Sequence, residues 1–403
     1  SGGARPLVKP FDHRPGQMEP TPPDEYRSDD CLWLFNTVPA YVAETGDLAF
    51  YDKVLPYADK GKDTVFGHLR RALEFNLERR GPHGLPASLR SDWNDCLGPG
   101  GESLFVAFQV RYGLQVYAEI ARLLNRPAEA AWAASEMATL DAAIQKYGWD
   151  GGWFVRKYRE DGVVLGSRQN EEGRIFLNSQ SWAVISGAAT PEQARMAMDA
   201  VEEHLASEYG LALFAPPFSK SSPLYGGALY NPGQKENPAI FNHTQAWAWI
   251  ADCMLGNGTR ANRNYRAYMP SRFNDIAEIR QVEPYVHCQG TNSQFSPRLG
   301  MGGLPWLTGT VAWSYHAATH YILGIRPEID GLRIDPCIPA EWKGFSVRRL
   351  FRGKVLDIRV ENPDGVQKGV ARLVLNGEEL TGNLIPAEAM REENHVVVVM
   401  GNA

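Results

Sequence analysis

Apolar residues recur every three or four positions over most of the first 325 residues, which is the pattern of amphipathic helices packed on a core. The run Leu32, Phe35, Val38, Tyr41 and Val42 predicts a helix that closes near Gly46. The same periodicity predicts helices over 68–77, 102–124, 128–147, 179–188, 191–207, 243–255, 259–268 and 309–323. Gly- and Pro-rich loops lie between them, and this order predicts a ring of helical hairpins instead of a βαβ alternation.

The pattern changes after Gly324, where apolar and polar residues begin to alternate around Gly, Asn and Pro turns. The pair Asn376–Gly377 is a strong hairpin signal within this stretch. We therefore predict a mainly α domain over residues 1–325 and a small all-β domain over residues 326–403.

The composition and charge of the chain argue against several classes of function. The formal net charge is −6 with Lys and Arg scattered, so neither a nucleic-acid face nor a polybasic membrane contact is predicted. An apolar run of about 18 residues is absent, as is the apolar core of a secretory signal. Five widely spaced cysteines without a CxxC pair argue against disulfides and a zinc cage, and favour a reducing, cytoplasmic location.

The segment Ser91–Cys96, SDWNDC, is the sharpest local feature and lies in a Gly/Pro-rich loop over 81–101. An Asp-rich loop is often only a solvated turn or an Asx cap. Here, however, Trp93 stands between two acids, and eleven Trp and sixteen Tyr in the chain suit sugar binding as well as core packing. A carboxyl beside an indole loses hydration and its pKa tends upward, which suits a general acid.

A second cluster follows in the loop from Tyr230 to Asn237, which carries Lys235 and Glu236 and precedes a helix predicted to begin near His243. Donors at a helix N-terminus make a natural anion site. The plain structural alternative is that Asn242 or Thr244 caps this helix and His243 is a buried structural histidine.

Two weaker signals have structural alternatives of the same kind. Thr308–Gly309 precedes a helix and could hold a phosphate or simply cap that helix, while Gln289 belongs to a polar-aromatic string that could be an ordinary buried strand. His316 and His320 have a helical i, i+4 spacing, but without HExxH or a third ligand we predict no metal site. The phosphate-binding motifs GxGxxG and GxxxxGK[ST] and the nucleophile elbow GxSxG are absent, which argues against nucleotide binding and an α/β-hydrolase.

Taken together, the strings SDWNDCL, KENPAIFNHTQAW, EPYVHCQ and WLTGT resemble, in this order, glycoside hydrolase family 94, the cellobiose and chitobiose phosphorylases. The resemblance implies part of an (α/α)₆ barrel, its C-terminal part, followed by the β domain. It further implies that this chain is the C-terminal half of a longer enzyme, which requires its N-terminal half for activity and forms a homodimer.

The resemblance also implies the role of each site residue. Asp95 becomes the general acid. The phosphate ligands become His243, Gln289, Thr308 and Gly309. The substrate-binding residues become Trp93, Asn94, Tyr230, Lys235 and Glu236. The implied reaction is inverting phosphorolysis of a β-linked glucose disaccharide, of cellobiose or cellobionic acid type, to α-glucose 1-phosphate and a free acceptor. Phosphate is then a substrate, and no cofactor is implied.

The residue set fits this chemistry. An inverting hydrolase needs two carboxylates, whereas phosphate is itself a nucleophile, so one acid and a cluster of donors suffice. The open alternatives are a chitobiose or β-1,2-oligoglucan phosphorylase, an inverting β-glycoside hydrolase, and a non-catalytic sugar-binding half-barrel. Two departures from the family pattern concern the acceptor. Gly226 stands where a cellobiose-type enzyme has an acceptor-binding Glu, and Cys96 favours glucosides over N-acetylglucosaminides.

Overall fold

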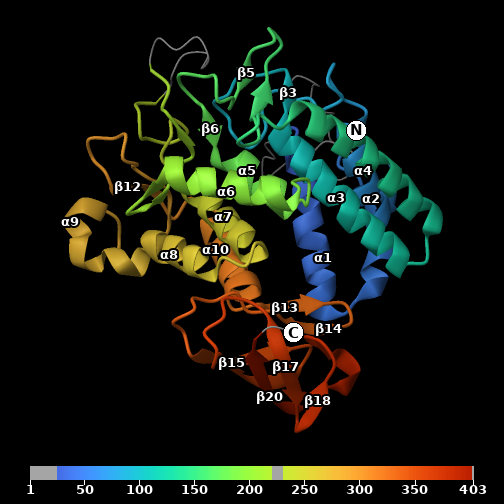
Figure 1. Cartoon of the computed structure of the whole chain (residues 1–403). Helices are drawn as coiled ribbons and strands as arrows, with labels where there is room; N and C mark the ends of the chain where they lie inside the picture. Colours follow the sequence, from blue (N-terminus) through green and yellow to red (C-terminus); the bar gives the residue numbers. More distant parts are fainter. Residues whose placement is uncertain (1–24, 220–229, 402–403) are drawn as a thin grey trace.

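The computed structural model describes residues 25–219 and 230–401. Helices fill one part of the molecule, and the C-terminal strands form a separate layer beneath them (Figure 1). The helices are α1 (Leu34–Thr45), α2 (Val65–Leu77), α3 (Leu104–Leu123), α4 (Pro127–Tyr147), α5 (Leu177–Ile185), α6 (Pro191–Leu205), α7 (Asn242–Met254), α8 (Gly258–Tyr268), α9 (Ala277–Arg280) and α10 (Thr310–Ala317). The helices predicted from periodicity are confirmed to within a few residues, and α9 is an addition.

The helix ends follow local chemistry. The first helix stops at Gly46, which adopts a left-handed φ of 76° and donates its N–H to the Val42 carbonyl at 2.7 Å. The helix α6 begins with a capping box in which Thr190 and Gln193 satisfy each other's backbone N–H groups. The predicted helix over 309–323 is present as α10 followed by a π-helical turn, Ala318–Ile322.

An aromatic cluster occupies the centre of the helical region. The Trp33 ring stacks on Trp247 at 5.8 Å and meets Trp182 and Trp313 edge-on at 5.6 Å and 5.8 Å. Trp182 and Trp247 are almost fully buried. Part of the chain's unusual Trp content therefore fills the core, and the same cluster supports the site described below.

Short strands, which helical periodicity does not predict, tie the loops together. One sheet joins β3 (Glu102–Ser103), β4 (Lys157–Tyr158) and β5 (Val164–Leu165), and another joins β10 (Ile240–Phe241), β11 (Cys288–Thr291) and β12 (Gly302–Pro305). Three two-stranded pairs complete the set: β1 (Val54–Pro56) with β2 (Lys62–Thr64), β6 (Ile175–Phe176) with β9 (Phe214–Ala215), and β7 (Ala206–Ser207) with β8 (Gly210–Leu211). The β10–β11–β12 sheet matters for function, because it brings together the segments around His243, Gln289 and Thr308.

The C-terminal region is all β. A three-stranded sheet orders β13 (Ile325–Glu328), β14 (Gly331–Ile334) and β19 (Leu384–Pro386), and a five-stranded sheet orders β15 (Gly344–Phe351), β16 (Lys354–Glu361), β20 (Glu393–Met400), β17 (Val370–Leu375) and β18 (Glu378–Leu380). The strands β16 and β20 pair in parallel. The predicted hairpin at Asn376–Gly377 is confirmed: both residues have positive φ, as a type I′ turn requires, and they join β17 to β18.

Buried side chains of α7 and α8 share one core with these strands. Within the described residues, none of the helices has the length and apolar character needed to cross a bilayer.

Candidate active site

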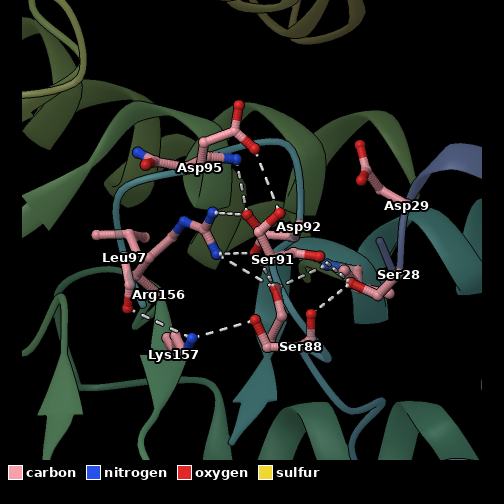
Figure 2. A network of polar contacts seen from close by, with 12 residues as sticks. Ser28, Asp29, Ser88, Ser91, Asp92, Asp95, Leu97, Arg156 and Lys157 are labelled. Atoms are coloured by element: carbon pink, nitrogen blue, oxygen red, sulfur yellow. Dashed lines mark hydrogen bonds and ion pairs between the residues drawn. The ribbon is translucent and has the colours of Figure 1, made fainter. Parts of the chain in front are cut away.

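The predicted acid lies in a loop, residues 88–97, that is pinned to the segment preceding α1. Ser28 donates its backbone N–H to the Ser91 carbonyl at 3.1 Å, and its hydroxyl donates to the Ser88 carbonyl at 3.2 Å. Arg27 forms isolated bridges with the backbone of Leu89 and Ser91. These contacts, of which those of Ser28 are visible in Figure 2, fix the acid loop against a segment some sixty residues away in sequence.

Asp92, the first acid of the loop, is buried and structural. Arg156 donates from both terminal nitrogens to its two oxygens, each at 2.7 Å, and Ser103 adds a third donor at 2.6 Å. Burial alone would raise the pKa of Asp92, but the Arg156 charge and these hydrogen bonds outweigh it and hold the pKa below its usual value. Asp92 is therefore an ionised anchor of the loop.

Asn94, within the loop, and Lys157, on β4, also support the loop. The buried Asn94 accepts a hydrogen bond from the Cys96 N–H at 2.9 Å, an Asx turn of the kind expected for an Asp/Asn-rich loop. Lys157 donates to the Gly98 carbonyl at 2.6 Å and to the Ser88 hydroxyl at 3.1 Å. Burial lowers the pKa of Lys157 to about 8. Asn94 thus supports the turn on which the predicted acid stands.

Asp95 differs from Asp92 in its exposure and in its partners. Its side chain is 54% exposed, and Figure 2 shows the carboxyl on the side of the loop opposite Lys157 and Ser88. It accepts a hydrogen bond from the Ser91 hydroxyl at 3.3 Å and forms an ion pair with Arg27 at 3.0 Å. Of the two acids, Asp95 alone is open to a ligand.

The structure brings three of the four predicted phosphate ligands together in a set that we call the phosphate cradle: His243, Thr308 and Gly309, with Thr310 added. The Thr308 hydroxyl lies 3.3 Å from His243 Nε2, and a Cβ on Gly309 would lie 3.2 Å from the same nitrogen. Thr308 also accepts the Thr310 N–H at 3.1 Å at the start of α10. The close approach explains why a glycine stands at position 309.

His243 is neutral at physiological pH because burial lowers its pKa to about 4. The suggested caps of α7 are wrong: Asn242 donates to the Cys288 carbonyl at 2.5 Å, and the Thr244 hydroxyl donates to the Phe241 carbonyl at 2.8 Å. At α10 the N-cap residue is Gly309, and the hydroxyl of the preceding Thr308 accepts the first N–H of the helix, that of Thr310, at 3.1 Å. The first N–H groups of α7 thus have no side-chain cap competing with an anion, whereas the Thr310 N–H of α10 is already bound to Thr308.

Gln289 lies on β11, and the Lys235 ammonium donates to its side-chain oxygen. The Lys235 nitrogen also lies 5.8 Å from the Tyr230 ring centroid and 6.0 Å from that of Phe241. The sequence assigned Gln289 to phosphate and Lys235 to sugar, and the structure joins them in one contact.

Glu236 and Tyr230 face the acid loop. Burial raises the pKa of Glu236; Lys235 opposes this shift and Asp95 adds to it, and Cys96 forms a hydrogen bond with the carboxyl. Burial, together with the charges of Glu236, Cys96 and Asp95, raises the pKa of Tyr230. These mutual effects place the 230–236 loop within electrostatic range of Asp95. Gly226, the other predicted acceptor position, lies outside the described residues.

Trp93 connects the acid loop to the phosphate cradle. Its ring centroid lies 4.7 Å from Phe241, 5.4 Å from Trp247 and 6.1 Å from His243. The acid loop and the cradle therefore meet at this indole, while the 230–236 loop approaches the same region through Lys235 near Phe241 and through Glu236, which bonds to Cys96. Through Trp93, the loop that carries the half-exposed Asp95 is thus linked to a cluster of neutral hydrogen-bonding groups.

Two contributors were missed by sequence analysis: Arg156 and Arg27. A charged residue in the apolar run WFVRKY is a usable signal for Arg156, because a buried guanidinium needs a carboxylate. No local sequence pattern identifies Arg27 as a functional residue. In the part of the chain that the structure describes, no group of three or more His, Cys, Asp or Glu side chains could hold a metal ion.

The chain matches two known family models. The family model for the glycosyl hydrolase 94 superfamily catalytic domain matches residues 12–324. The chain belongs to this superfamily. Residues 325–381 match a second family model, the C-terminal domain of glycosyl hydrolase family 65. The predicted family resemblance is therefore confirmed.

Characterised members of the superfamily align over most of the chain. It is 44% identical to the N,N'-diacetylchitobiose phosphorylase of Vibrio proteolyticus, with 95% of this chain and 49% of that protein covered. The solabiose phosphorylase of Paenibacillus borealis is 35% identical, with 89% and 48% covered, and the cellobionic acid phosphorylase of Neurospora crassa is 30% identical, with 83% and 43% covered. The chain spans about half the length of these relatives.

Solved structures show the fold alone. A sialidase covers 92% of this chain, and 33% of its own length, with a TM-score of 0.60 at 15% identity. The GH78 family rhamnosidase of Bacillus sp. GL1 covers 84% of this chain, and 34% of its own length, with a TM-score of 0.55 at 13% identity.

Proposed function

We propose that this chain forms the catalytic half of an inverting disaccharide phosphorylase. Asp95 protonates the glycosidic oxygen while phosphate, held by His243, Thr308 and Gly309, attacks the anomeric carbon from the opposite face. The observation that carries the proposal is the packing of Trp93, two residues before the acid, against His243 at 6.1 Å. One half-exposed carboxyl and a cluster of neutral donors suit a reaction whose nucleophile is already anionic.

The donors of the cradle are neutral, and this has a chemical reason. A cation held against phosphate would stabilise the bound dianion and weaken its attack, whereas hydrogen-bond donors orient it with less charge neutralisation. The N-termini of α7 and α10 contribute their dipoles to the same site. On this proposal phosphate is a substrate and no cofactor is needed.

The sugar specificity has two supported candidates. Cys96, next to the acid, led us to a glucose disaccharide of cellobiose or cellobionic acid type. The 44% identity to the diacetylchitobiose phosphorylase gives an N-acetylglucosamine disaccharide equal support. We propose that Lys235, Glu236 and Tyr230 contact the acceptor, because their loop lies beside Asp95.

The wider assembly is also a proposal. Helices α1–α10 would form part of an (α/α)₆ barrel within a domain over 1–325, and residues 326–403 the β domain. The relatives' length supports a requirement for a further half of the enzyme, and the five free cysteines suit the cytoplasm. A homodimer stays a prediction.

The deciding experiment measures product formation by the full-length enzyme with and without phosphate. We expect turnover only with phosphate, and an Asp95→Asn variant that loses at least a hundredfold in kcat while still binding phosphate, since general acids contribute about 10²–10⁴-fold. An undiminished rate in phosphate-free buffer would show a hydrolase. Synthesis from α-glucose 1-phosphate or α-N-acetylglucosamine 1-phosphate, with a panel of acceptors, identifies the sugars.

A further inference from the structure

We propose that Arg27 is a positioning residue for the general acid. It binds one oxygen of Asp95, so that the other oxygen carries the proton delivered to the leaving group. This inference rests on the proposed function and adds to it a residue that lies far from the acid in sequence.

The contacts of the carboxyl are one-sided. The ion pair from Arg27 at 3.0 Å and the hydrogen bond from the Ser91 hydroxyl at 3.3 Å both fall on Oδ1. Within the described residues, Oδ2 of Asp95 accepts no hydrogen bond. A carboxyl whose Oδ1 is occupied by two donors keeps its proton on Oδ2, since a proton on Oδ1 would face those donors. The arrangement selects which oxygen faces the glycosidic bond.

The backbone on either side of Arg27 is anchored to the acid loop. Its backbone bridges to Leu89 and Ser91, and the neighbouring Arg90 N–H donates to the Tyr26 carbonyl at 3.1 Å. The guanidinium Nε is buried without a partner in the described part of the chain. The backbone of Arg27 is therefore anchored beside the acid loop, and its partly exposed guanidinium is held by the ion pair with Asp95.

The titratable groups around Asp95 are mostly acidic, which makes the positive charge of Arg27 important. Asp30, Glu236 and Tyr230 are the other titratable groups whose charges couple to Asp95. Burial raises the pKa of Asp30, Arg27 lowers it, and Asp95 raises it. Lys235, the cation of the 230–236 loop, acts on Glu236 and is bound to Gln289. Arg27 is thus the cation that faces Asp95 among acidic neighbours.

The consequence for the reaction follows from the proton transfer. The Oδ2–H bond breaks as the proton passes to the glycosidic oxygen, the bond from the anomeric carbon to that oxygen breaks, and a phosphate oxygen bonds to the carbon. Asp95 is left as a carboxylate, and Arg27 stabilises this negative charge. Loss of Arg27 should therefore matter only when the leaving group needs a proton.

The test compares two substrates in the full-length enzyme: a disaccharide, whose leaving group needs the acid, and the β-glycosyl fluoride of the same donor sugar, whose leaving group does not. Because a half-exposed ion pair is worth little, we expect Arg27→Gln to lower kcat on the disaccharide about fivefold and on the fluoride less than twofold. Arg27→Lys should restore most of the loss. Arg168→Gln, which removes an exposed arginine paired with Asp150, serves as matched control and should change neither rate.

Two pH-dependent readouts complete the experiment. The alkaline limb of kcat/KM on the disaccharide should move up by roughly half a pH unit in Arg27→Gln, because removing a nearby cation favours the protonated acid. Carboxyl-carbon NMR, assigned with Asp95→Asn, should show the same displacement of the Asp95 titration without any turnover.

Equal losses on both substrates, or an unmoved NMR titration, would overturn the role of Arg27. A wild-type enzyme that turns over without phosphate would instead overturn the proposed function. Even if the proposed function fails in this way, the NMR measurement still tests whether Arg27 acts on Asp95.

Discussion

The Asp92–Arg156 pair offers a quantitative test of how the acid loop is built. Replacing Arg156 with Met keeps most of the side-chain volume and removes the cation. Asp92 is 2% exposed, so water cannot replace the lost donors, and only Ser103 and the Asn94 N–H continue to contact it. An ionised carboxyl in such a place is costly, and the loop must shift or the carboxyl must take up a proton.

The magnitude follows from the class of interaction. Removing one partner of a buried ion pair typically costs about 3–5 kcal/mol. With a urea m-value near 3 kcal/mol/M, the midpoint of unfolding should fall by roughly 1 M or more. The pKa of Asp92 is depressed in the folded protein, so the pair stabilises above the unfolded-state value of about 3.9 and loses this effect as pH falls through the lower folded value. The difference between wild type and variant should therefore shrink below about pH 4.

The assay is urea unfolding followed by tryptophan fluorescence and circular dichroism, at pH 7 and at decreasing pH. Arg159→Met is the matched control, because Arg159 lies three residues further along, is partly exposed and pairs with the exposed Asp161; it should change stability by less than about 0.5 kcal/mol. A cycle with Asp92→Asn measures the coupling directly. A loss below about 1 kcal/mol in Arg156→Met, or equal losses in both methionine variants, would refute the anchoring role.

Two further predictions concern buried histidines. Replacing His243 with Ala should weaken phosphate binding about tenfold or more, and by the same factor at pH 6 and pH 8 in calorimetry, because the pKa near 4 keeps the ring neutral at both; a greater loss at pH 6 would mean that the ring binds as a cation. Burial and the charges of His316, Arg349 and Arg326 lower the pKa of His320 to about 3. As pH falls below about 6.5, His320 therefore takes up a proton in the unfolded state but not in the folded state, and the protein loses stability. His320→Gln should show a smaller loss of unfolding free energy between pH 7 and pH 5 than wild type, and an equal loss would contradict this.

Sequence analysis predicted the helices well because each is long enough to show its own period. Each strand of the β3–β4–β5 and β6–β9 sheets has two residues, too few to alternate, and only tertiary pairing creates them. The same limit applies to the site. The order of Trp93, Asp95, His243 and Thr308 along the chain suggests a shared site, but only the β10–β11–β12 sheet and the Trp93 packing bring their segments together.

The roles of the two loop acids show the limit most clearly. Asp92 and Asp95 are equivalent as letters in SDWNDC, and only the family resemblance favoured the second. The structure separates them by burial: Arg156 binds Asp92 in the core, whereas Asp95 is half-exposed and pairs with Arg27. The carboxylate of Asp92 is buried and held by the Arg156 guanidinium and by two further hydrogen bonds, from Ser103 and the Asn94 N–H, whereas the half-exposed carboxyl of Asp95 keeps one oxygen without a hydrogen bond in the described part of the chain. On the proposed function, Asp95 can act as the general acid because Asp92 holds the loop in place.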